Sequence, residues 1–323
     1  DVITSALPDN SLDGEVWLTT AQLKLSTRTI DKLRLSAELR YNERSNQTPI
    51  NSYSYVVQDS HNGGAVSNRP HSYTNTRIGL NANYRFGARS SLRGGYKHEV
   101  MERSSDNTTS EREETQEDTI FAKWKIKPLS SLDIALYGEA SSRDGSAYNT
   151  LGGENPLMQK FHLADRDRTK LGAVIDYMAT DKLFLSASAD YNKDDYTHTT
   201  IGLTEATQPV VTINFSYQPR HNISTYGYYT YENIQSSQNG FDMSPFVDGW
   251  QADFDDTIDT AGIGAKLTGL GRWAIGADFV HSKSVGEIKM TDLPGTRTAS
   301  PYTANKTEQN SPAQWTRYDH TKH

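Results

Sequence analysis

The sequence predicts an all-β protein, a transmembrane antiparallel up-and-down β-barrel. Three observations lead to it: apolar and polar residues alternate over stretches of about ten residues, the connections between these stretches are alternately short and long, and apolar content is low. Hydrophobic residues make up 35% of the 323 residues, and no run approaches the roughly 20 apolar residues of a membrane helix. In a membrane barrel only every second strand residue meets lipid, so low hydropathy is expected.

The alternation is clearest where Leu33, Leu35, Ala37, Leu39 and Tyr41 interleave with polar residues. Such a period of two gives a strand one apolar and one charged face. Twelve strands are predicted, near 16–25, 33–43, 75–86, 91–101, 118–127, 132–141, 168–178, 183–191, 209–217, 223–232, 257–267 and 272–282. Each is long enough to cross a bilayer when tilted.

The connections give each predicted hairpin a short end and a long end. Short turns are predicted at 26–32, 87–90, 127–131, 179–182, 218–222 and 268–271, and long polar loops at 44–74, 102–117, 142–167, 192–208 and 233–256. Outer-membrane barrels have short periplasmic turns and long external loops. A β-propeller blade has a similar repeat length but contains four short strands. The connections therefore favour the barrel.

The predicted domain organisation is a single barrel domain over 1–323, present in part, with 284–323 as an external loop or tail. Twelve strands about 4.8 Å apart would close at a radius of only about 12 Å. Asp1 is not preceded by a signal peptide. We therefore expect a piece of a longer protein with a larger, even-stranded barrel.

Composition limits the functions that the chain can carry by itself. The net charge of −7 is spread along the chain, so nucleic acid is not an expected partner. The sequence has no cysteine, which excludes disulfides, thiolate metal sites and haem attached through C-x-x-C-H. Any redox centre would belong to another chain.

The charged positions of the predicted strands should point into the barrel. They could grip a partner inside the barrel, filter ions, or simply line a hydrated lumen with mutually paired charges. These positions are Arg34, Glu38, Arg40, Arg77, Arg85, Arg93, Lys97, Glu99, Lys123, Lys125, Asp133, Glu139, Lys170 and Asp176.

Other chemical motifs are weak. Asp253, Asp255, Asp256 and Asp259 could offer oxygen ligands to calcium, but they lack EF-hand spacing, and a solvated loop is the preferred interpretation. The nine histidines, such as His98 on an apolar face, are interpreted as surface residues rather than haem ligands. The glycine pairs at 262–264 and 269–271 lack the context of a phosphate-binding loop and predict backbone geometry only. No hydrolase or metalloprotease motif occurs, so an enzyme is not expected.

Several stretches together resemble one family. Residues 40–49 (RYNERSNQTP), 67–73 (SNRPHSY), 155–168 (NPLMQKFHLADRDR) and 189–196 (ADYNKDDY) are similar in order and spacing to the MtrB/PioB family, and the likeness covers most of 33–283. The resemblance implies an outer-membrane barrel that houses a periplasmic decahaem cytochrome and docks it to a cell-surface multihaem cytochrome, for extracellular electron transfer and metal reduction. Haem is then a cofactor of the partners and not of this chain.

Family members are longer and usually have a signal peptide and a Cys-x-x-Cys segment, neither of which is found here. Bacterial outer-membrane lipid is the remaining partner that the resemblance implies. The pattern of residues alone prefers neither the sheath nor a porin-like channel for small polar solutes, and the resemblance favours the sheath.

Overall fold

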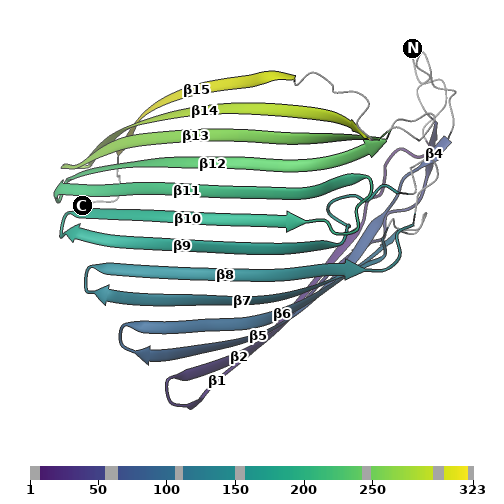
Figure 1. The fold of residues 1–323 in the computed structure, drawn as a ribbon, viewed down its shortest axis with the longest axis horizontal. Helices are drawn as coiled ribbons and strands as arrows, with labels where there is room; N and C mark the ends of the chain where they lie inside the picture. Colours follow the sequence, from purple (N-terminus) through teal and green to yellow (C-terminus); the bar gives the residue numbers. More distant parts are fainter. Residues whose placement is uncertain are drawn as a thin grey trace.

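The computed structural model describes residues 8–54, 65–105, 112–149, 157–241, 249–293 and 302–318. Within them one antiparallel sheet of 13 strands follows chain order, and two short strands pair separately. Figure 1 shows an open, curved wall with β1 at one edge and β15 at the other. Its strands are β1 (Val16–Ile30), β2 (Leu33–Asn46), β5 (His71–Gly87), β6 (Ser90–Ser105), β7 (Glu114–Leu129), β8 (Leu132–Gly145), β9 (Arg166–Thr180), β10 (Leu183–Asp195), β11 (Gly202–Arg220), β12 (Ile223–Phe241), β13 (Gly249–Leu270), β14 (Trp273–Leu293) and β15 (Tyr302–Tyr318); β3 (Ser52–Ser54) and β4 (Ala65–Ser67) form the separate hairpin.

All twelve predicted strands are present, and the fold class is confirmed. The predicted short turns are tight turns at 31–32, 88–89, 130–131, 181–182, 221–222 and 271–272. They lie together at one end of the sheet, here called the turn end (Figure 1). Lys32 and Gly271 adopt positive φ there, at 61° and 64°, which lets the chain reverse within two residues. The opposite end is called the loop end.

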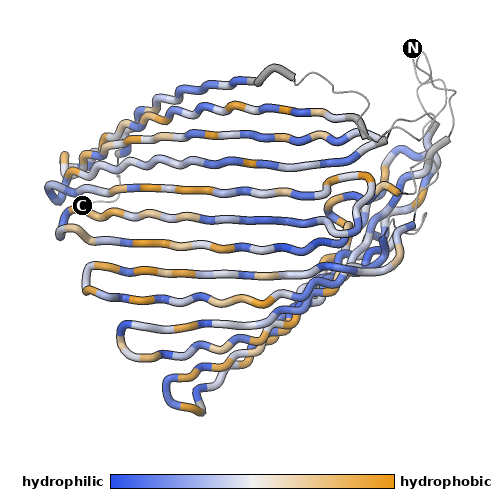
Figure 2. Tube along the Cα trace, viewed as in Figure 1, coloured by the Kyte–Doolittle hydropathy of each residue, from blue (hydrophilic) through white to orange (hydrophobic). Residues whose placement is uncertain are grey.

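The strands are longer than predicted, and the loops correspondingly shorter. Predicted loop 233–256 is strand up to Phe241 and again from Gly249, and predicted loop 192–208 contains only residues 196–201 between β10 and β11. Residues 242–248 lie outside the described ranges. The prediction failed because residues 192–195 and 235–239 are polar on both faces and so carry no alternation of apolar residues. Figure 2 shows this hydrophilic colouring toward the loop end. In β13, Trp250, Ala252 and Phe254 do alternate with polar residues, but they stand on the inner face.

The prediction that 284–323 is a loop or tail is wrong over most of its length. Residues 284–293 complete β14, and Tyr302–Tyr318 forms β15, which pairs antiparallel with β14. The sequence of β15 is mostly Thr, Asn, Gln and charged residues, so it has no apolar stripe to reveal it. Backbone hydrogen bonds to β14 define this strand instead.

The described residues have little conventional core. Their buried hydrophobic side chains are few and lie toward the loop end: Leu163, Ala164, Tyr196, Ile201 and Ala252. Large apolar side chains such as Ile213, which is 57% exposed, cover one face of the sheet instead. Within the described ranges, no helix is long and apolar enough to cross a membrane.

Candidate functional site: the polar wall of the sheet

The strand register separates the sheet into two chemically different faces. Across β2, β5, β6 and β7 the directly paired residues include Ala37, Leu80, Tyr96 and Ile120, all on the apolar face, here called the outer face. The opposite, inner face carries every charged residue that the sequence placed inside the barrel. The register therefore confirms that these residues share one face, whereas their contact with a partner remains a prediction.

A depression of about 440 Å³ lies on the inner face and is lined by residues from β2, β5, β6, β7, β8 and β9. One depression can collect side chains from so many consecutive strands only if the sheet is concave on that side. Its lining includes the predicted Glu38, Arg40, Arg77, Arg93, Lys97, Glu99, Glu139 and Lys170 together with Glu117, Arg166 and Arg168.

Near the loop end, the inner face carries a row of charges that runs directly across six strands. Its members, in strand order, are Arg40, Arg77, Glu99, Glu117, Arg143 and Arg166. Like charges stand next to one another in this row, but each acid meets a base: Arg77 Nη2 lies 2.6 Å from Glu99 Oε2, and Arg166 Nη2 lies 2.9 Å from Glu117 Oε1. The acids of this row are therefore ion-paired with arginines of the same row rather than free.

The following rows toward the turn end continue this pairing. The Glu139 carboxylate forms ion pairs with two lysines: Lys97 Nζ lies 3.2 Å from its Oε2, and Lys170 Nζ lies 3.5 Å from its Oε1. Arg168 makes two hydrogen bonds to Asp194 of β10, with donor–acceptor distances of 2.5 and 2.6 Å. Because both oxygens of Asp194 accept from one guanidinium, this geometry is specific as well as charged. The middle of the wall is thus neutralised within the chain.

Two tyrosines on the inner face each reach across an intervening strand. Tyr137 of β8 faces Gly172 of β9 and donates its hydroxyl hydrogen to Asp190 of β10. A Cβ atom on Gly172 would lie 2.3 Å from the Tyr137 ring, so only glycine leaves the ring room to cross. Tyr226, Gly264 and Asp278 repeat the arrangement on β12, β13 and β14.

The sequence did not predict these bridges. It assigned the glycines at 262–264 to backbone geometry, whereas the structure shows aromatic rings lying over them: Cβ atoms on Gly262 and Gly264 would come within 2.3 and 2.5 Å of Tyr228 and Tyr226 ring carbons. Pairing of a strand glycine with a cross-strand ring fixes register. Only the register identifies which ring faces which glycine.

The outer face has the features of a lipid-facing surface. Tyr84, Trp124, Tyr177 and Tyr217 stand near the turn end, where rings of this kind mark a membrane–water boundary. Farther from the turns the outer positions of β13 change from Ile263 and Ala261 to Asp259, Thr257, Asp255 and Asp253. The apolar band therefore stops well before the strands do, and the wall continues beyond the membrane at the loop end.

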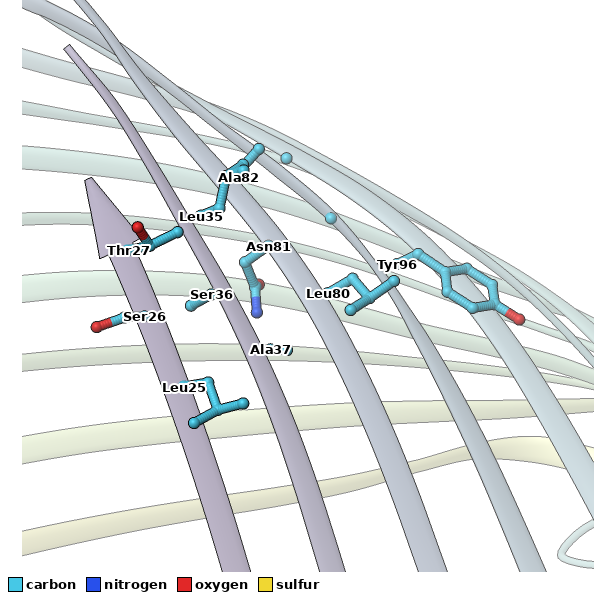
Figure 3. Close-up of a pocket in the computed structure, with 12 residues that line it drawn as sticks. Leu25, Ser26, Thr27, Leu35, Ser36, Ala37, Leu80, Asn81, Ala82 and Tyr96 are labelled. Carbon is cyan, nitrogen blue, oxygen red and sulfur yellow. The ribbon is translucent and has the colours of Figure 1, made fainter. Parts of the chain in front are cut away.

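An apolar hollow of about 660 Å³ lies on the outer side of β1, β2, β5 and β6, where Ala37, Ala82 and Gly94 leave space among larger side chains. Figure 3 shows Leu25, Leu35, Leu80 and Tyr96 around it. It forms part of the apolar surface and contains no charged residue.

The four acids that the sequence offered as a weak calcium candidate do not lie in the solvated loop that was the preferred interpretation. Asp253, Asp255 and Asp259 lie on the outer face of strand β13 and Asp256 on its inner face, rather than in a loop. Amides and hydroxyls already occupy the oxygens: Asp255 accepts from Asn233 at 2.6 Å, and Asp253 from Ser237 at 2.7 Å. No group of three or more potential ligands is arranged to hold a metal ion in the described residues.

The histidines have ordinary partners where the structure describes them. His98 Nδ1 lies 2.8 Å from Asp118 Oδ1 on the outer face, His281 Nδ1 lies 2.8 Å from Asn310 Oδ1, and His198 Nδ1 lies 3.0 Å from Asp165 Oδ2. The ring of His162 packs edge-on against Phe161, with centroids 5.5 Å apart. His71 begins β5.

Two arginines hold the loop at 157–165 against the loop end of the wall. Arg112, whose side chain is 6% exposed, donates to the Leu163 carbonyl at 2.6 Å and pairs with Asp165 at 2.7 Å. Arg143 donates to the carbonyls of Ala164 and Phe161 at 2.9 and 2.7 Å. This loop falls within the stretch 155–168 that resembles the family, but the sequence alone did not show that arginines fix it.

Buried Tyr196 packs in the same region. Burial raises the pKa of the Tyr196 phenol above its ordinary value, and the nearby Asp194 carboxylate acts in the same direction. The phenol therefore stays protonated at neutral pH. Leu157 and Phe161 remain 50% and 60% exposed on the loop surface, so the arginines fix a loop that presents apolar side chains outward.

These observations define a class of protein: a membrane-spanning β-sheet wall with a lipid-facing outer side, a charged and concave inner side, tight turns at one end and projecting strands at the other. The MtrB/PioB family model of outer membrane beta-barrel porins matches residues 1–322. The chain belongs to this MtrB/PioB family, and its location is the bacterial outer membrane, which it crosses many times with strands.

A relative supports the membership. The chain is 31% identical over 284 residues to the outer membrane protein MtrB of Shewanella baltica (strain OS185), an alignment that covers 86% of this chain and 40% of the relative. The chain thus spans about 40% of the length of that protein.

Two solved outer-membrane proteins match the chain with low TM-scores. The ferric-catecholate import receptor Fiu from E. coli K12 has a TM-score of 0.45 at 10% identity, covering 98% of this chain and 69% of that one. The trimer form of OmpT from Vibrio cholerae has a TM-score of 0.32 at 10% identity, covering 94% and 99%. These scores are too low to support a functional argument.

Proposed function

We propose that this chain forms part of an outer-membrane sheath that houses a periplasmic multihaem cytochrome and docks it to a cell-surface multihaem cytochrome, so that electrons cross the outer membrane. The proposal rests on membership in the MtrB/PioB family and on what the resemblance of residues 155–168 and its companion stretches implies. The structural observation that supports it best is the concave, charged inner face, which offers a protein partner a wide polar surface.

The expected width of the whole barrel supports the same proposal. Since this chain supplies 13 strands and spans 40% of its relative, the full-length protein is expected to have roughly two to two and a half times as many strands. About 26 strands tilted by about 40° close at a backbone radius of about 26 Å. Inward side chains then leave a passage about 40 Å across, wide enough for a slender protein.

In this proposal the barrel insulates and positions but does not carry electrons. The 323 residues include no cysteine, so haem cannot be attached to them through the usual C-x-x-C-H motif. Electrons that cross about 30 Å of hydrocarbon then require redox groups, which a partner protein must supply. The chain accordingly acts as a structural component rather than as an enzyme.

The competing proposal is a porin-like channel for small polar solutes, which the family description favours. A hydrated wall of paired charges such as Glu139 with Lys97 and Lys170 is compatible with solute passage. The two proposals differ in what fills the lumen: a protein in the first, and water in the second.

The test uses the full-length barrel in liposomes with a trapped, membrane-impermeant electron acceptor and an external reductant. The sheath proposal expects no electron transfer by the barrel alone and transfer once a multihaem partner is assembled inside it. Transfer by the haem-free barrel would contradict the proposal. So would an assembled complex that transfers no electrons while small sugars pass freely, and this result would establish the channel instead.

A further inference from the structure

One part of the inner face departs from the pairing found elsewhere. Arg34, Arg85, Arg93, Lys123 and Lys125, here called the turn-end cations, are inner-face residues of β2, β5, β6 and β7 near the tight turns. None of the five makes an ion pair with a carboxylate in the described part of the chain. Their partners are neutral: Arg34 lies 3.5 Å from Ser26 Oγ, and Arg93 lies 3.2 Å from Asn81 Oδ1.

The register makes this arrangement costly for the chain by itself. Arg93 and Lys123 are directly opposite one another on β6 and β7, and like charges at such a position destabilise a sheet. In the charge row nearer the loop end, adjacent like charges are compensated by acids of the same row. No acid lies beside the cations of the row formed by Arg34, Arg93 and Lys123: Asn83 stands between Arg34 and Arg93, and Tyr137 follows Lys123. The inner-face acids nearest the turns, Asp133 and Asp176, lie on β8 and β9, and Asp133 is paired with Lys127 at 2.9 Å.

Aromatic rings hold two of these cations in place. Lys123 Nζ lies 5.1 Å from the centroid of the Tyr137 ring, and the guanidinium carbon of Arg93 lies 5.7 Å from that of Phe121. The Tyr137 ring is fixed in turn by its hydrogen bond to Asp190 across Gly172. The positive charges are therefore positioned over the concave face and stay half-exposed or exposed, with Lys123 the least exposed of the five.

The other half of the wall has the opposite bias. At the inner positions of β10 to β14 the described acids are Asp190, Asp194, Glu232, Asp256 and Asp278. The described bases at these positions are Lys266 and, next to a turn, Arg220. The positive charge of the inner face is thus concentrated on its first strands. A partner with a patterned surface would meet different potentials on the two sides.

We infer that the turn-end cations form a docking site for an acidic surface of the protein that occupies the lumen, and that they orient this protein as it enters from the turn end. The inference rests on the proposed function, in which the turn end faces the periplasm. Charge complementarity supports it, because five cations that form no ion pair within the described residues are a favourable site for carboxylates of a partner. It extends the proposed function by naming the part of the wall that selects the partner and the chemistry that it recognises.

The experiment compares variants of the full-length barrel purified from outer membranes with its co-purifying cytochrome, measured as haem absorbance per barrel during washes of increasing salt. Arg93→Gln with Lys123→Gln should weaken retention of haem about tenfold, equivalent to about 1.4 kcal/mol, and shift its loss to lower salt. The matched control, Lys193→Gln with Lys283→Gln, removes the same charge from outer-face positions and should retain haem like the unchanged protein.

Two further variants keep the test decisive. Arg93→Lys with Lys123→Arg keeps both charges and should retain haem. Arg34→Gln with Lys125→Gln should lose haem, and it replaces Arg93→Gln with Lys123→Gln if that variant fails to fold. Folding is checked by the heat-dependent mobility of the barrel in detergent gels.

The outcomes separate the inference from the proposal beneath it. An unchanged barrel that carries no haem would contradict the proposed function and, with it, the inference. The inference alone would be overturned if the barrel without substitutions carries haem and the neutralised variants retain it at every salt concentration, as the control does. The sheath proposal would then remain.

Discussion

Replacing an outer-face residue in the centre of the apolar band tests which face meets lipid. Ile213 is suited to this test because it lies at the middle of the outer positions of β11, between Tyr217 near the turn and Pro209, and it is 57% exposed. Its chain neighbour Thr212 points to the inner face, where its hydroxyl lies 3.0 Å from that of Thr230. The pair Ile213→Arg and Thr212→Arg therefore differs in the face that receives the charge.

The expected magnitude follows from depth in the membrane. Arginine on the lipid face of a barrel costs about 2 to 4 kcal/mol at the bilayer midplane and about 0 to 1 kcal/mol near the interfaces. The central position of Ile213 places its substitution in the first range. At Thr212 the arginine meets a hydrated, acid-biased surface, and the change costs a neutral hydrogen bond, about 1 kcal/mol.

The assay is denaturant-induced unfolding of the full-length barrel in lipid vesicles, followed by tryptophan fluorescence, with the folded fraction checked by heat-dependent mobility. We expect Ile213→Arg to lower the free energy of unfolding by at least about 1 kcal/mol more than Thr212→Arg. Equal losses for the two variants would refute the assignment of the faces, and a larger loss for Thr212→Arg would reverse it. Leu80→Arg, at another outer position, should behave like Ile213→Arg.

Three more outcomes follow from the structure. Gly172→Ala should displace the Tyr137 ring and break its hydrogen bond to Asp190, which lowers the free energy of unfolding by about 1 to 3 kcal/mol. The control Gly79→Ala, whose Cβ would meet nothing closer than 4.0 Å, should have little effect. Equal losses of unfolding free energy in the two variants would show that the tyrosine bridge contributes nothing. Arg112→Met removes the donor to the Leu163 carbonyl, so proteolysis within 157–165 should speed up while the midpoint of barrel unfolding stays nearly unchanged; an unchanged cleavage rate would count against a role in fixing the loop. Protease added to intact cells should cut accessible segments within 44–74 or 142–167, whereas cleavage at 179–182 would invert the assigned topology.

The positions of the strands and the chemistry of their faces could be predicted from the sequence alone. Alternation such as that of Leu33 to Tyr41 determines both, because the side chains of a strand point to opposite faces in turn whatever the rest of the fold does. The tight turns could be located for a similarly local reason. Every charged residue assigned to the inner face lies on one face, since a shift of one residue would have exposed apolar side chains to the lumen throughout.

Only the tertiary structure decided how far the strands extend and which residues meet across them. Strand β15 and the polar loop-end residues of β10 and β12 are defined by backbone hydrogen bonds to a neighbouring strand, which leave no periodic trace in polar sequence. The partners of Tyr137, Arg112 and Asp255 lie 53, 51 and 22 residues away in the chain, so their contacts exist only once the register is set. The lack of an ion-pairing acid at Arg93 and Lys123 arises in the same way, because whether a charge is compensated depends on what its register places beside it.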